Sequence, residues 1–206
     1  MNKDQAKRAI DLGVAGTGLV VLAPFLAWLA LAVRLVHGSP VLFSQERAGL
    51  GGRPFRILKL RTMTDVRGPG GALLPDADRL TGFGRFLRSS SLDELPELWN
   101  VVRGDMSLVG PRPLPTSYLP RYTEREARRH EVKPGITGLA QVSGRNGLSW
   151  EERLEVDVRY VETRSLALDL RILVRTFGQV LRRSGISSDG HATMAELRPP
   201  APGGAA

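Results

Sequence analysis

The feature that most constrains the fold of this chain is an uncharged segment close to its N-terminus. Over residues 12–33, about 22 positions, the sequence contains no Asp, Glu, Lys or Arg. A helix needs roughly 20 apolar residues to cross the hydrocarbon core of a bilayer. A buried core helix is the alternative. A signal peptide is not indicated, because no small-residue cleavage site follows the segment and the sequence after it is rich in Arg. We therefore predict a helix inserted in a membrane.

A proline and the flanking charges indicate how this helix enters the membrane. Pro24 lies in the middle of the segment, where a proline costs a helix about 3 kcal/mol unless a kink absorbs the misfit. Lys3, Lys7 and Arg8 precede the segment and Arg34 follows it. Positive flanks prefer the cytoplasm, and a helix that bends at Pro24 and returns keeps both flanks there. The sequence favours this re-entrant helix over a kinked helix that crosses the bilayer.

Charge and composition restrict the partners. The net charge is +8 with a pI near 10.7, and most of the excess lies beyond residue 36. Such a chain favours a polyanionic partner: nucleic acid, anionic lipid or a phosphorylated substrate. The sequence has no Cys, and its three His residues are far apart. Disulfides and thiolate metal sites are therefore excluded, and no zinc motif is present.

Beyond the apolar segment, the sequence pattern predicts helices and a small sheet, which is typical of the α+β class. Apolar and basic residues alternate over 54–63, as in a strand, and 41–43 is a second strand candidate. Gly- and Pro-rich sequence predicts a loop over 65–78, and 113–120 is expected to be irregular. Helices are predicted over 81–88, 91–102, 121–132, 150–162 and 166–183. The last is basic and amphipathic, so it either lies in a membrane interface or packs on the core.

The adjacent carboxylates of Asp93 and Glu94 are the sharpest chemical feature. Ser91 and Glu94 have capping-box spacing, which places both carboxylates in a helical first turn, where the dipole favours their charged forms. Capping alone would account for Glu94. The neighbouring arginines in the sequence are Arg85, Arg88, Arg103 and Arg112. A carboxylate among arginines suits phosphoryl chemistry, in which it attacks phosphorus or binds Mg²⁺.

Three further features could hold phosphate groups. Arg112 lies between Pro111 and Pro113, which stiffen its backbone and mount its guanidinium for phosphate binding. Lys59 alternates with apolar residues on its strand, and 133–138 is a glycine-rich turn that can bring backbone N–H groups to a ligand. Each has an ordinary alternative: a loop arginine, a solvent-facing strand and a plain turn.

In their order along the chain, these motifs resemble the bacterial sugar transferase family, in particular its small, minimal-domain monotopic phosphoglycosyl transferases. The resemblance covers about residues 7–197 and is specific, because many motifs recur in the same order. They are KLRTM at 59–63, RSSS at 88–91, DELPELWN at 93–100, GDMSLVGPRP at 104–113, KPGITG at 133–138 and QVSGRN at 141–146.

The resemblance implies a mechanism. Asp93 and Glu94 match the catalytic pair, so Asp93 would attack the β-phosphate of a UDP-sugar, releasing UMP and leaving an aspartyl phosphosugar. A polyprenyl phosphate such as undecaprenyl phosphate would then attack this intermediate. Mg²⁺ is the implied cofactor, with Asp93 in its coordination sphere. The implied substrate-binding residues are Lys59, Arg88, Arg112 and Arg145. Direct transfer, with the aspartate only holding Mg²⁺, is the rival mechanism.

The resemblance also implies an arrangement on the bilayer of the bacterial inner membrane. Residues 1–36 would be a re-entrant broken helix, 37–198 a catalytic domain on the cytoplasmic face with interfacial amphipathic helices, and 199–206 a disordered tail. The family's Ser-Pro pair at the break is Ala23-Pro24 here. Residues 185–194 look like those of members that act on UDP-linked N-acetylated sugars.

The competing class is a membrane-anchored nucleic-acid-binding protein, which the positive charge alone would allow. The sequence offers no recognisable reading helix, and only 6% of its residues are aromatic. Nucleic acid is therefore not an expected partner.

Overall fold

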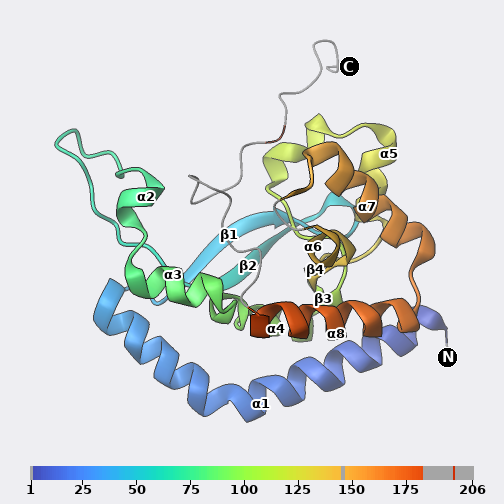
Figure 1. Ribbon diagram of the computed structural model, residues 1–206, viewed down its shortest axis with the longest axis horizontal. Helices are drawn as coiled ribbons and strands as arrows, with labels where there is room; N and C mark the ends of the chain where they lie inside the picture. Colours follow the sequence, from blue (N-terminus) through green and yellow to red (C-terminus); the bar gives the residue numbers. More distant parts are fainter. Residues whose placement is uncertain (1, 145–146, 183–196, 198–206) are drawn as a thin grey trace.

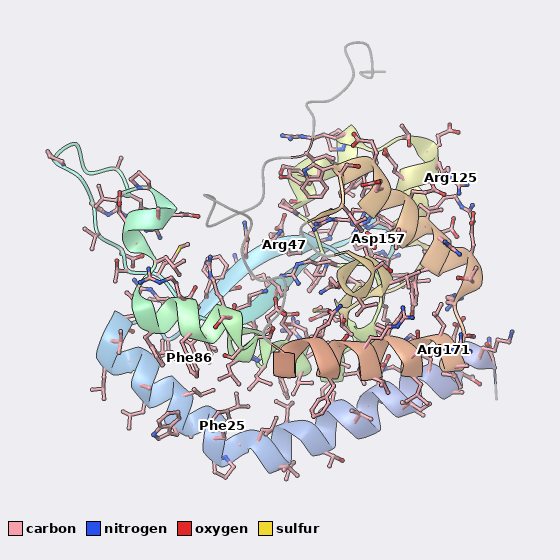
Figure 2. All side chains as sticks on the ribbon, viewed as in Figure 1. Phe25, Arg47, Phe86, Arg125, Asp157 and Arg171 are labelled. Carbon is pink, nitrogen blue, oxygen red and sulfur yellow. The ribbon has the colours of Figure 1, made fainter. Side chains whose placement is uncertain are left out.

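The first element is one long helix that bends near its middle. In the computed structural model, which describes residues 2–144, 147–182 and 197, α1 runs from Lys3 to His37 without interruption. Figure 1 shows α1 as a wide V, and Figure 2 places Phe25, the neighbour of Pro24, close to the bend. The helix is thus bent and not broken, because a bend makes room for the proline ring and tolerates the missing backbone hydrogen bond.

Both arms of α1 pack against the rest of the chain. On the N-terminal arm, Ala15 is fully buried in the main hydrophobic core, and the Asp11 carboxylate accepts a hydrogen bond from the backbone N–H of Leu108 at 3.1 Å. On the C-terminal arm, Leu29 and Val33 are fully buried in a second apolar cluster, with side chains of β2 and α3. The folded domain therefore lies on the concave side of α1, between its two arms (Figure 1).

Much of α1 is apolar and exposed. Val20 and Leu35 are 76% and 77% exposed, and only 11% of the helix's most apolar 18-residue window is buried. A core helix would be mostly buried, so this alternative is disfavoured. Within the described residues, α1 is the one helix long and apolar enough to cross a membrane. These properties fit insertion in a bilayer.

Two small sheets organise the domain within the described residues. β1 (Leu42–Ala48) pairs antiparallel with β2 (Pro54–Leu60), joined by the 3-10 turn η1 (Leu50–Gly52), and Leu42 lies opposite Leu60. The predicted strand over 54–63 is confirmed as far as Leu60, and the candidate at 41–43 is the start of a longer strand. β3 (Ser107–Val109) and β4 (Gly135–Thr137) form a parallel pair.

The glycine-rich turn at 133–138 has a packing role. A Cβ at Gly135 would lie 2.1 Å from the backbone nitrogen of Gly110, and one at Gly138 would lie 2.2 Å from the oxygen of Gly110. Only glycine allows two backbones to approach this closely. The middle of the predicted phosphate-binding turn, Gly135–Thr137, is therefore strand β4, packed against the segment that carries Arg112.

Helices surround these sheets (Figure 1), and several predictions are confirmed. The helices predicted over 81–88, 150–162 and 166–183 are α3, α7 and α8. Their bounds, with those of the shorter helices, are α2 (Asp76–Arg79), α3 (Gly82–Ser89), η3 (Thr116–Arg121), α5 (Glu124–Ala127), η4 (Arg128–Glu131), α6 (Leu139–Ser143), α7 (Trp150–Thr163) and α8 (Leu166–Arg182). The single helix predicted over 121–132 is wrong, because the chain forms the separate turns α5 and η4 there. The predicted tail, 199–206, lies outside the described residues.

The amphipathic helix α8 has apolar residues on two sides. Ile172 is buried in the main core, while Leu170, Val174 and Phe177 are more than 60% exposed. Figure 1 shows α8 running above the N-terminal arm of α1. The two alternatives for this helix are thus not exclusive: one side packs on the core, and the other presents an apolar stripe.

Candidate active site

Asp93 and Glu94 lie in a tight turn and not in the first turn of a long helix. Ser91 adopts a left-handed backbone conformation (φ 56°) with no capping hydrogen bond. The 3-10 turn η2 spans Leu92–Glu94, and the helix α4 (Glu97–Arg103) begins only after it. The predicted capping box is therefore wrong. Pro96 has no N–H to continue an α-helical ladder, and this stretch closes with shorter i→i+3 bonds such as Glu94 N–H to the Ser91 carbonyl at 3.2 Å.

The Glu94 carboxylate does not cap a helix and instead pairs with two cations. Its Oε1 lies 2.6 Å from the Lys59 ammonium on β2 and 2.7 Å from an Arg112 guanidinium nitrogen after β3. Lys59 also lies 3.1 Å from the carboxylate of Glu97 on α4. Three predicted site residues, Lys59, Glu94 and Arg112, thus meet in one network. Glu97, which belongs to the motif at 93–100 but was not predicted as a site residue, joins them; its position three residues after Glu94 was the available signal.

The carboxyl groups of this network have divergent acidities. Burial, followed by the charge of Glu94, raises the pKa of Asp93 to about 6, against the pull of Lys59, Arg112 and Arg88. Burial alone would raise the pKa of Glu94 too, but Arg112 and Lys59 outweigh it and hold that pKa well below its usual range. Such separation of neighbouring carboxyl groups is typical of catalytic sites, although structural ion-pair networks produce it as well.

Glu97 is the most buried carboxyl group of the network, at 2% exposure. Burial raises its pKa to about 7; the nearby Lys59 charge opposes this shift and the Glu94 charge adds to it. The folded protein therefore keeps a proton on Glu97 under conditions in which the unfolded chain has lost it.

This difference predicts a pH-dependent stability. Since the pKa of Glu97 rises on folding from the model-peptide value of 4.5 to about 7, its stabilising contribution is full below about pH 4.5 and is lost as pH rises through 7. We expect Glu97→Gln to gain stability relative to the parent between pH 5 and pH 8, by at most about 3 kcal/mol. Thermal unfolding of both proteins across this range measures the gain; a difference that does not change with pH would contradict it.

The remaining predicted residues have separate places. The Arg88 Nε donates to the Thr62 hydroxyl at 3.0 Å, and Arg88 lines the same cavity as Arg112. Arg145 lies outside the described residues. Sequence reasoning missed the buried pair of Arg129 and Asp157, whose nitrogen and oxygen are 2.8 Å apart. Arg129 also donates to the backbone oxygen of Arg112 at 2.6 Å, so this pair fixes the segment that presents Arg112.

A cavity of about 600 Å³ opens beside the network, within the usual range for ligand sites. Five arginines and two carboxylates line it, together with an aromatic wall of Tyr118 and Trp150. The charged lining residues are Arg47, Arg88, Glu94, Arg112, Arg129, Arg153 and Asp157. Asp93 is not among the lining residues, but it adjoins Glu94 and is 7% exposed. The excess of positive charge suits a ligand with more than one phosphate.

Comparisons with known proteins agree with this chemistry. The family described as "Bacterial sugar transferase" matches residues 2–183. The chain is 54% identical over 187 residues to the "Uncharacterized sugar transferase EpsL" of Bacillus subtilis, covering 91% of this chain and 93% of that protein. It is 46% identical over 188 residues to a "UDP-glucose:undecaprenyl-phosphate glucose-1-phosphate transferase" of Caulobacter vibrioides, covering 86% and 70%. Over 196 residues it is 42% identical to a "UDP-galactose-lipid carrier transferase" of Erwinia amylovora, but spans only 41% of that longer protein.

Proposed function

Because the chain belongs to the bacterial sugar transferase family, we propose that it transfers a sugar-1-phosphate from a UDP-sugar to undecaprenyl phosphate and releases UMP. The names of its relatives support a polyprenyl-phosphate sugar-phosphate transferase. The observation that carries the proposal is the network of Lys59, Glu94 and Arg112 beside Asp93, at the edge of a cavity rich in arginine.

Asp93 is the proposed nucleophile. One of its carboxylate oxygens bonds to the β-phosphorus, the bond from that phosphorus to the bridging oxygen breaks, and the bridging oxygen leaves with its electron pair in UMP. A phosphate oxygen of the lipid then attacks the same phosphorus and restores the carboxylate. Arg112 and Lys59 both donate hydrogen bonds to Glu94 in this structure. From these positions they can neutralise charge on the phosphate oxygens.

Mg²⁺ fits the carboxylates that are present. The described residues contain no group of three or more metal-binding side chains, but Mg²⁺ is often held by one or two carboxylates together with substrate phosphates. Asp93 is the proposed ligand, and the ion would neutralise charge on the transferred phosphate. In the rival mechanism the aspartate serves only this purpose. Trapping a labelled sugar-phosphate on the protein separates the two, because only the covalent mechanism leaves label on Asp93.

The sugar is decided by a substrate panel. UMP release is measured with undecaprenyl phosphate and UDP-glucose, UDP-galactose or UDP-N-acetylglucosamine. The relatives' names mention glucose and galactose, which makes a UDP-hexose the first candidate. The N-acetylated sugar remains a prediction, since the residues behind it, 185–194, lie outside the described part. No UMP release from any of these donors would contradict the proposed function.

The proposed membrane arrangement is re-entrant and on the cytoplasmic side of the inner membrane. It is supported by the two arms of α1, which both pack against one domain through Asp11 on one arm and Leu29 and Val33 on the other. A helix crossing the bilayer would instead separate its ends by the ~30 Å hydrocarbon core. The exposed apolar stripe of α8 would then lie at the interface.

Residue 2 tests this topology, and the chain has no Cys to interfere. We expect a cysteine at Asn2 to resist an impermeant thiol reagent added outside intact cells. Pro24→Leu should straighten the helix and expose this cysteine in part of the population, while Lys3, Lys7 and Arg8 oppose complete inversion. Labelling of the Asn2 cysteine without the Pro24 change would mean that α1 crosses the membrane.

A further inference from the structure

More arginines line the cavity than are paired with its two carboxylates. Glu94 pairs with Arg112, and Asp157 pairs with Arg129, so both carboxylates that line the cavity are engaged. Arg47, from β1, also lines the cavity. Figure 2 labels Arg47 on this strand and Asp157 on α7, two of the elements that contribute to the lining.

Arg47 has an unused donor in a buried position. Its Nη2 donates to Gln45 at 2.6 Å, but its Nε is buried without a hydrogen-bond partner among the described residues. Burial, followed by the charge of Arg112, lowers the pKa of Arg47. An anion in the cavity would stabilise Arg47 in two ways. It would accept a hydrogen bond from the unpaired Nε, and it would offset the repulsion between the Arg47 and Arg112 guanidinium groups.

Arg47 lies near both the catalytic network and the aromatic wall of the cavity. Arg47 is within electrostatic reach of Arg112, in the catalytic network, and also of Tyr118. Tyr118 and Trp150 meet edge to face with ring centroids 5.9 Å apart, and both line the cavity. If a UDP-sugar binds with its β-phosphorus at Arg112 and its base against this aromatic wall, its α-phosphate lies next to Arg47.

We propose that Arg47 binds the α-phosphate of the UDP-sugar, the phosphate that departs in UMP, with the nucleoside lying toward Tyr118 and Trp150. This inference rests on the proposed function. When the bond between the β-phosphorus and the bridging oxygen breaks, the electron pair and a full negative charge move to the α-phosphate, whichever group attacks. Arg47 stabilises that charge, so it acts in the transition state and retains UMP afterwards.

The test compares UMP with uridine as inhibitors of the full-length chain in lipid nanodiscs. Arg47→Met should raise the inhibition constant of UMP roughly 10- to 100-fold and leave that of uridine unchanged, because only UMP carries the phosphate. It should also lower kcat/KM by about 10²-fold or more. Arg56→Met, an exposed arginine on the paired strand β2, is the matched control and should behave like the parent.

Arg47→Lys keeps the charge but lacks the Nε donor, so an intermediate UMP constant is expected; it also serves if Arg47→Met does not fold. An unchanged UMP constant in Arg47→Met, or an equal loss for UMP and uridine, would overturn the role of Arg47 while the proposed function stands. A parent protein that releases no UMP from any UDP-sugar would instead remove the proposed function itself.

Discussion

Asp93→Asn should abolish turnover, with a loss of at least ~10³-fold in UMP release, because an amide cannot replace a carboxylate as nucleophile or metal ligand. The substitution should not unfold the protein. Burial already disfavours the charged form of Asp93 and raises its pKa to about 6, so the neutral amide removes a buried charge. We therefore expect equal or higher thermal stability together with lost activity.

The matched control for Asp93→Asn is Asp78→Asn, which neutralises an exposed carboxylate on α2 and should keep normal turnover. Near-normal UMP release by Asp93→Asn would remove both the nucleophile and the Mg²⁺-ligand roles. Loss of activity accompanied by unfolding would mean that Asp93 is needed for structure.

Lys59→Met should have the largest effect on stability. Lys59 is the cation shared by Glu94 and Glu97, at 2.6 Å and 3.1 Å, and the Glu97 side chain is only 3% exposed. At pH 8, above the pKa of about 7, the Glu97 carboxylate of the parent is charged, so removing Lys59 leaves this buried charge without its cation or forces it to take up a proton, at a cost of roughly 3 kcal/mol. In a protein of this size that lowers the thermal midpoint by about 6–12 °C. UMP release should also fall strongly, because a phosphate-neutralising cation is lost.

A second change separates the two effects of Lys59→Met. Adding Glu97→Gln removes the uncompensated carboxylate, so the double variant should recover most of the thermal stability and little of the activity. Recovery of activity along with stability would show that Lys59 only supports the fold. A midpoint for Lys59→Met equal to that of the parent would show that the network contributes nothing to stability.

The elements with strong local signals were predictable. The alternation over 54–63 identified β2, helical spacing identified α7 and α8, and the uncharged segment identified α1. The residues that meet at the site were largely identified through the family resemblance, since Lys59, Glu94 and Arg112 are up to 53 positions apart in the sequence and only the fold brings them together.

The errors have local physical causes. The capping box at Ser91 fitted the spacing rule, but Pro96 and the left-handed Ser91 turn the segment into η2. Glu94 was assigned a backbone partner, yet its neighbours are cations from other elements. Arg47 and the pair of Arg129 and Asp157 were missed because burial of a charged side chain is a tertiary property that has no periodic signal in sequence.

The bent helix α1 has a consequence for how this protein can be engineered. Its side chains complete the interior of the domain, with Ala15, Leu29 and Val33 fully buried and Asp11 accepting a hydrogen bond from Leu108 of β3. Exchanging α1 for an unrelated apolar helix would open two cavities in the interior and leave the backbone N–H of Leu108 without its acceptor. A soluble enzyme is therefore better sought by replacing the outward-facing Val20, Val21 and Leu35 with polar residues than by deleting the helix.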